Sequence, residues 1–186
     1  MATAAVLPVT ATQWNLDPAH SSAEFKVKHM MISNVKGSLR GLKGMLSLDE
    51  SNPANSKIQA SVDLSTISTG DDQRDGHLKS ADFFDAAKFP EMTFQSTLAK
   101  RNDDGEYRVT GDLTIHGVTK KVTFAVEGPG APGKDPWGNT RIGISATTKI
   151  NREDFSLTWN SALETGGVLV GKEVTLTIDA EFIKQQ

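Results

Sequence analysis

The chain has 186 residues, no cysteine, a formal net charge of −3, 37% apolar residues and 23% charged residues. This length suits one domain, and the composition is that of a globular protein rather than a disordered one. The absence of cysteine excludes disulfides, thiolate metal sites and cysteine nucleophiles, and the slightly acidic charge argues against nucleic-acid binding, which usually needs a basic face.

Residues 1–13 are expected to form a flexible N-terminal segment. The segment has an apolar run of only four residues, 4–7, and no basic residue before it. A secretory signal needs both a basic start and a longer apolar run, so we expect a cytoplasmic protein. We also expect no transmembrane segment, because no apolar run approaches the ~20 residues that cross a bilayer.

Strands are predicted along most of the remaining chain. Three segments, 121–127, 141–150 and 173–182, alternate strictly between apolar and polar residues, which is typical of strands with one buried face. Turn residues such as Asp104-Gly105 separate many of the predicted strands. Weaker strand patterns cover 23–28, 35–39, 42–48, 57–64, 93–98 and 107–115.

Two long connections interrupt this pattern. Residues 69–90 are expected to hold short helical turns near 77–80 and 81–87, and Asn151 is placed to cap a helical turn over 152–155. Residues 128–133 are expected to be a flexible surface linker. With eight or more strands, the chain is predicted to be an all-β sandwich or barrel. We expect one domain over 14–183 and a tail over 184–186.

Polar motifs give little sign of catalysis. The four histidines lack the spacing of a metal site, no nucleophile elbow is present, and residues 166–173 lack a phosphate-loop spacing. We therefore expect no metal, no cofactor and no enzymatic activity. The Arg74–His77 cluster has two interpretations. Arg74 and His77 contact an anionic head group, or Asp75 accepts backbone hydrogen bonds and pairs with Arg74 to fix a loop.

Apolar residues are also frequent in the connections, at 30–32, 83–84, 155–159 and 168–170. These residues either cap an ordinary core or line the mouth of a cavity.

Six motifs in chain order resemble the YceI-like family. They are WNLDPAHSSAEF at 14–25, HMMISNVKG at 29–37, RDGHLKSADFFD at 74–85, FPEMTF at 89–94, GDLTIHGVTK at 111–120 and INREDF at 150–155. The resemblance implies an extended, antiparallel, eight-stranded, lipocalin-like β-barrel. It also implies a hydrophobic tunnel that binds a polyisoprenoid or quinone-like lipid, and a homodimer. Family members are often periplasmic, and they usually have glycine where this chain has Ser156.

The resulting hypothesis is a non-catalytic protein for transport, storage or sequestration of a long-chain amphipathic lipid. Met31, Phe84, Phe155 and Trp159 are expected to flank the tunnel opening, and His29, Arg74, His77 and Arg152 are candidates for head-group contacts. The strand residues expected to line the tunnel are Phe25, Val27, Phe94, Phe124, Ile144, Ala146, Leu176 and Ile178.

Two alternatives remain open. A lipid-modifying enzyme would use His20, Asp75 or His77 beside the tunnel. An interaction module would have a barrel filled with side chains and would bind its partner through loops or a strand face.

Overall fold

Neighbouring strands pair antiparallel throughout the computed structural model, which describes residues 11–164 and 166–186. The strands are β1 (Thr12–Leu16), β2 (Ser22–His29), β3 (Ser33–Leu39), β4 (Lys43–Leu48), β5 (Lys57–Asp63), β6 (Glu91–Arg101), β7 (Tyr107–Ile115), β8 (Val118–Glu127), β9 (Gly133–Lys134), β10 (Thr140–Asn151) and β11 (Val170–Lys184). In the connections between these strands, the described residues form one α-helix, α1 (Asp72–Lys79), and four 3₁₀ turns. The turns are η1 (Pro18–His20), η2 (Pro53–Asn55), η3 (Leu64–Thr66) and η4 (Arg152–Phe155).

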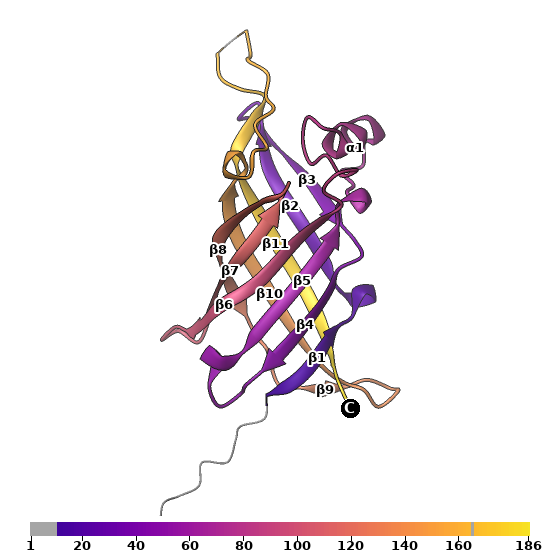
Figure 1. The fold of residues 1–186 in the computed structure, drawn as a ribbon, viewed down its shortest axis with the longest axis vertical. Helices are drawn as coiled ribbons and strands as arrows, with labels where there is room; N and C mark the ends of the chain where they lie inside the picture. Colours follow the sequence, from indigo (N-terminus) through magenta and orange to yellow (C-terminus); the bar gives the residue numbers. More distant parts are fainter. Residues whose placement is uncertain (1–10, 165) are drawn as a thin grey trace, which may run out of the picture.

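The strands close into a barrel with eight strand positions (Figure 1). β11 pairs with β10 along one edge and with β2 and β1 in succession along the other, so β1 and β2 share one position. β3 and β4 pair with β2 and β1 respectively and share a second position. The remaining six positions are β5, β6, β7, β8, β10 and β11. The expected eight-stranded antiparallel barrel is therefore confirmed.

The predicted strands are present, and several extend beyond the alternating pattern. β6 covers 91–101 where 93–98 was expected, and β11 covers 170–184 where 173–182 was expected. β1 and the two-residue β9 were not predicted. β1 begins inside the segment expected to be flexible, whose residues 1–10 lie outside the described part of the chain. β9 includes Gly133, the last residue of the expected surface linker.

The barrel has two distinct ends (Figure 1). The α1 end carries α1, the β2–β3 turn and the long connection between β10 and β11. The β9 end carries β9, the β6–β7 turn and the end of β11. Among the described residues, no helix is long and apolar enough to span a membrane.

Residues 64–90 cover the α1 end where β3 and β6 diverge. The segment is attached to β3 by a bridge between Ser38 and Ser68, and its ends meet where the Leu64 N–H donates to the Pro90 carbonyl. Two helical turns were expected here, but one helix spans 72–79 because the Asp71 side chain caps it, and 81–87 forms turns. The expected cap at Asn151 is confirmed, since its side chain accepts from the Glu153 N–H and begins η4.

The packed core forms two clusters. The first joins β1–β5 to β10 and β11 and includes Trp14 and Phe182. The second joins β7, β8, β10 and β11 to η4 and includes Phe155 and Leu157. Trp14, Phe155 and Phe182 are almost completely buried. Four members of the second cluster, Ile115, Ile150, Phe155 and Leu157, fill the barrel toward the α1 end, and its other members lie beside the part of the interior that remains open.

Candidate ligand-binding cavity

A cavity lies inside the barrel, and the centres of water-sized spheres can occupy about 180 Å³ of it. On this measure one water needs roughly 10–15 Å³, so the cavity is far larger than a single water site. Its wall is almost entirely apolar. Lining side chains include Leu39, Leu42, Leu46, Ile58, Val62, Met92, Phe94, Val109, Leu113, Phe124, Val126, Ile144, Ala146, Leu176, Ile178 and Phe182.

Strand geometry places these side chains on the wall. Successive residues of a strand point to opposite faces, so alternate residues of each strand turn inward. The antiparallel register sets Ala146 opposite Ile178 and Val109 opposite Phe124 across neighbouring strands. The wall is therefore continuous from one strand to the next.

Six of the eight strand residues expected to line a tunnel are on this wall. They are Phe94, Phe124, Ile144, Ala146, Leu176 and Ile178. Phe25 instead packs between the two core clusters, and Val27 lies half-buried on β2 outside the cavity lining. The difference arises because Phe25 and Val27 lie farther along β2 toward the α1 end, where the barrel is filled, whereas Ala23 near the start of β2 lines the cavity.

Sequence reasoning missed the wall contributed by β3, β4 and β5. Leu46 and Leu48 on β4, and Ile58, Ala60 and Val62 on β5, all line the cavity. The signal was available on β5, because Ile58, Ala60 and Val62 alternate with polar neighbours in the predicted strand 57–64. It was weaker on β4, where Leu46 follows the apolar Met45. If alternate residues of every predicted strand had been assigned to the inward face, these residues would have been included.

The loop residues expected to flank the opening lie elsewhere. Phe155 is only 1% exposed and belongs to the second core cluster, and Phe84 packs against both clusters. Trp159 packs edge-on against His77 with ring centroids 4.7 Å apart. Met31 is 61% exposed at the tip of the β2–β3 turn. At the α1 end Phe84 and Phe155 therefore pack into the barrel core, whereas Met31 projects into solvent.

The cavity extends toward the β9 end. Its lining there includes Pro53 from η2 and Gly128-Pro129 after β8. Polar side chains on the wall include Ser96 of β6 and Tyr107 of β7. The Ser96 hydroxyl accepts the Ile58 N–H at 2.9 Å. Tyr107 begins β7 and occupies an inward-facing position at the same end.

The barrel and its sequence match a known family. Residues 14–182 match the family model of the YceI-like domain. The chain belongs to the YceI-like family. A UPF0312 protein of Staphylococcus aureus (strain bovine RF122 / ET3-1) is 42% identical over 172 residues, which cover 92% of this chain and 97% of that relative.

Solved structures show the same YceI-like fold. A YCEI protein of Campylobacter jejuni is 31% identical, with a TM-score of 0.71 over 86% of this chain and 90% of that one. BcnA of Burkholderia cenocepacia is 23% identical, with a TM-score of 0.74 over 89% and 98%. A polyisoprenoid binding domain from Saccharophagus degradans is 17% identical, with a TM-score of 0.67 over 94% and 99%.

The four candidate head-group residues of this YceI-like barrel all lie toward the α1 end, away from the cavity lining. His29 ends β2, where it pairs with Ser33 and Val170. His77 lies on α1, and its Nε2 atom is 3.0 Å from a carboxylate oxygen of Asp82.

Arg74 and Asp75 form a loop-fixing network around Thr69. The Asp75 carboxylate accepts hydrogen bonds from the Thr69 hydroxyl and the Thr69 N–H, which lower the pKa of Asp75. The Arg74 guanidinium donates to the Thr69 hydroxyl at 2.7 Å and to the Thr69 carbonyl at 3.2 Å. Arg74 and Asp75 were expected to form an ion pair with each other, but both side chains instead form hydrogen bonds with Thr69. The network ties the start of α1 to the preceding strand connection.

Arg152 is a buried structural residue in the YceI-like barrel. It is 3% exposed, and its guanidinium donates to the backbone carbonyls of Leu157, Trp159, Val170 and Gly171. Burial lowers the pKa of Arg152. The side chain thus fastens both ends of the 156–169 connection to η4.

A charged cluster stabilises the β9 end. Arg141 on β10 donates to Asp17 at 2.6 Å, to Asp135 at 2.7 Å and to Glu181 at 2.5 Å. His20 lies 2.9 Å from Asp17. Metal-ligating atoms of Asp17, His20 and Glu181 lie within 4.8 Å of one another. The Arg141 guanidinium already supplies the positive charge among these groups, so the cluster is explained as an ion-pair network.

Proposed function

We propose that this YceI-like protein binds a long-chain apolar or amphipathic lipid, such as a polyisoprenoid or a quinone-like molecule, inside the barrel, and that it carries, stores or sequesters the lipid without catalysis. The apolar cavity is the observation that supports this function most directly. A solid-barrel interaction module would need a filled interior, so the cavity argues against that alternative.

Affinity for such a lipid would come from burial of its chain. Each methylene group removed from water contributes about 0.8 kcal/mol. A wall built from aliphatic and aromatic side chains offers few directional contacts, so it discriminates by length and width rather than by hydrogen bonding. We therefore expect affinity to rise with chain length until the cavity is filled and then to level off.

The lipid's polar end would lie toward the β9 end. Tyr107 is at the cavity boundary there, whereas Phe155 and Phe84 fill the α1 end. A phenolic hydroxyl can donate to or accept from an alcohol, carbonyl or phosphate oxygen. This assignment replaces His29, Arg74, His77 and Arg152 as the proposed head-group contacts.

The residues considered for catalysis do not line the cavity. Each of them is engaged in a hydrogen bond within the protein: His20 with Asp17, Asp75 with Thr69, and His77 with Asp82. A catalytic group must reach its substrate within hydrogen-bond distance or through one water. Their placement therefore supports binding without chemistry. The fold shared with the polyisoprenoid binding domain of Saccharophagus degradans is consistent with the same class of ligand.

Native mass spectrometry with added prenols tests the proposal. After extraction of copurifying lipid, the protein is incubated with all-trans prenols of increasing length, from farnesol to solanesol. Ala146→Phe, which places a ring in the cavity, should abolish the prenol adduct. Ala125→Phe is the matched control, because Ala125 lies between the inward-facing Phe124 and Val126 and so faces outward on β8.

Equal prenol adducts on the wild type and Ala146→Phe would contradict binding in this cavity, as would the absence of any adduct from the wild type. The same spectra report the subunit number. The homodimer and the cytoplasmic location expected from the sequence stay predictions.

A further inference from the structure

We propose that the tip of the β2–β3 hairpin, residues Met30, Met31 and Ile32, docks onto an anionic membrane surface. This contact is separate from the cavity and stands whether or not the cavity binds a lipid. The hairpin lies at the α1 end of the barrel, opposite the cavity's extension toward the β9 end (Figure 1).

The hairpin tip exposes three consecutive apolar side chains. Met30 is 39% exposed, Met31 61% and Ile32 80%. Single exposed apolar residues are common on protein surfaces. A run of three at the tip of one hairpin is different, because it gathers exposed apolar surface at a single place. Methionine side chains are flexible and adapt to irregular apolar surroundings.

The turn at this tip has an unfavourable sequence for its backbone. The Ile32 N–H donates to the His29 carbonyl at 3.1 Å, and the two residues between them have φ angles of 50° and 62°. Such a two-residue turn favours Asn-Gly, because positive φ is strained in residues with bulky side chains. This chain has Met30-Met31 at those positions. The strain is accepted where two large apolar side chains are presented to solvent, which points to a role for those side chains.

The stem of the hairpin is basic on its outer face. Lys26 and Lys28 on β2 and Lys36 on β3 are exposed, and Lys26 lies directly opposite Lys36 in the strand register. Like charges at such a position are destabilising. Within residues 11–164 and 166–186, none of these lysines forms an ion pair. The next outward-facing residue from the tip is Glu24, one step farther along β2.

The apolar tip, with Lys26, Lys28 and Lys36 on the strands next to it, fits an anionic bilayer. Apolar side chains enter the boundary between head groups and acyl chains, while nearby lysines are attracted to the anionic head groups. Docking would also separate Lys26 and Lys36 by counter-charges and so relieve their repulsion. A second copy of this chain is a poorer partner. A twofold contact through the same hairpin would bring the exposed lysines of both copies together, and their like charges would repel.

Vesicle cosedimentation of the full chain tests this docking. Wild type is mixed with phosphatidylglycerol vesicles or with phosphatidylcholine vesicles. We expect binding to phosphatidylglycerol that weakens as salt rises. Met30→Asn/Met31→Gly gives the turn its preferred sequence and removes two apolar side chains. This variant should keep or raise the melting temperature while vesicle binding falls by about tenfold or more.

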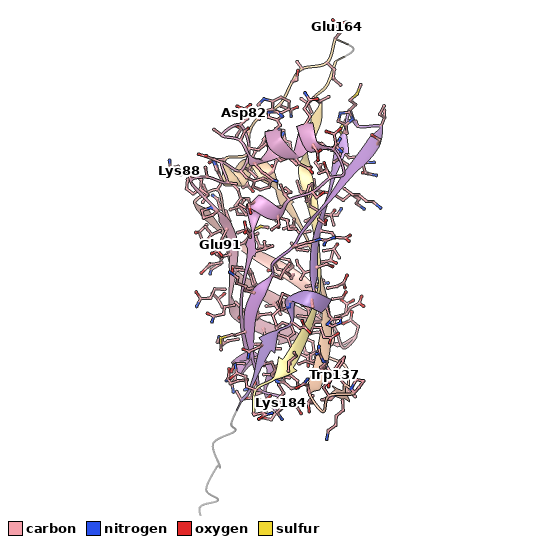
Figure 2. The ribbon with its side chains drawn as sticks, turned by 90° about the vertical axis from the view of Figure 1, so that its right-hand side faces the viewer. Asp82, Lys88, Glu91, Trp137, Glu164 and Lys184 are labelled. Atoms are coloured by element: carbon pink, nitrogen blue, oxygen red, sulfur yellow. The ribbon has the colours of Figure 1, made fainter. Side chains whose placement is uncertain are left out.

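Charge and position controls complete the design. Lys26→Gln/Lys36→Gln should weaken binding by about tenfold and reduce its salt dependence. Lys100→Gln/Lys134→Gln removes the same charge near the β9 end and should leave binding unchanged. Trp137→Ser is the apolar control, because Trp137 is 81% exposed and lies at the end opposite Glu164 (Figure 2).

Three results would overturn the proposal. The first is equal vesicle binding by the wild type and Met30→Asn/Met31→Gly. The second is loss of binding in Trp137→Ser, which would assign docking to the β9 end. The third is a concentration-dependent dimer that the hairpin variant abolishes, which would assign the tip to a second copy. None of these results bears on lipid binding in the cavity, which is tested separately by prenol adducts in native mass spectra.

Discussion

The aromatic ring of Phe94 lies over Gly111 on the neighbouring strand, in the space that a side chain would occupy. A Cβ atom added to Gly111 would be 2.5 Å from Phe94 Cζ and 2.4 Å from the Gln95 carbonyl oxygen. Phe94 lines the cavity and packs edge-on against Phe124, with ring centroids 5.1 Å apart. The glycine therefore lets one phenylalanine lie flat against the sheet, which leaves room inside the barrel.

Gly111→Ala should destabilise the barrel and alter the cavity. The added methyl group meets backbone as well as the Phe94 ring, so relaxation must move β6 or β7. We expect the free energy of unfolding to fall by roughly 1–3 kcal/mol, the usual cost of overpacking. Urea denaturation measures this change. Gly130→Ala is the control, because nothing lies within 4 Å of its added Cβ. Equal stability of the two variants would contradict the packing described for Phe94.

Arg152→Met should loosen the connection between β10 and β11. The substitution leaves the carbonyls that Arg152 now bonds, from Leu157 to Gly171, without their donors. We expect the free energy of unfolding to fall by about 3 kcal/mol, with faster amide hydrogen exchange over 157–171. Arg152→Lys should recover little, because an ammonium cannot reproduce the guanidinium geometry.

Arg108→Met is the control for this experiment, since Arg108 is an exposed residue on β7. If Arg152→Met weakened prenol binding without a change in stability or exchange, Arg152 would be a ligand contact and its structural assignment would be wrong.

Acid should weaken the β9 end through Asp17. Hydrogen bonds from Arg141 and His20 lower the pKa of Asp17 to about 2 from its ordinary value of 3.8. A carboxylate with a lowered pKa in the folded state stabilises the protein above its unfolded pKa, and the contribution is lost as pH falls toward the folded value. We therefore expect Asp17→Asn to be less stable than the wild type at pH 7, with the difference shrinking between pH 3.8 and about 2.

Thermal denaturation across that pH range measures the Asp17 effect. Asp103→Asn, in the exposed β6–β7 turn, serves as the control. A stability difference between wild type and Asp17→Asn that stayed constant down to pH 2 would show that the Asp17 charge is not the source of the effect.

Ser156→Gly should stabilise the protein. Ser156 follows η4 with a φ angle of 62°, the left-handed region that favours glycine. The lower backbone strain should outweigh the greater entropy of glycine in the unfolded chain, giving a gain of about 0.5–1 kcal/mol. Chemical denaturation checks the value. Ser161→Gly, in the same connection but at a position without positive φ, should destabilise instead.

The sequence predicted the barrel wall better than it predicted the loops. Alternation is a local signal, so Phe124 and Ile178 could be assigned to an inward face from their own strands. β1 escaped prediction because five residues carry too short a pattern. The apolar loop residue Phe155 was ambiguous, because composition alone does not distinguish a side chain that caps a core from one that flanks an opening.

Arg152 shows a second limit of sequence reasoning. Its partners are backbone carbonyls, which every residue carries, so no side-chain pattern reveals that it will be buried. Likewise, the Thr69 network became visible only when folding brought Thr69 beside Arg74 and Asp75. Parity within strands could be predicted, whereas the partners of polar groups in long connections required three-dimensional structure.

The position of β11 has a consequence for how the protein folds. β11 pairs with β10 on one side and with β1 and β2 on the other, and Trp14 is aligned with Lys184. During synthesis, the barrel cannot close until β11 has left the ribosome. Until then β2 and β10 have unpaired edges that can recruit other strands. Closure also depends on contacts of large sequence separation, which form slowly. Addition of the fifteen-residue strand β11 is therefore the step at which a nascent chain either completes the barrel or aggregates.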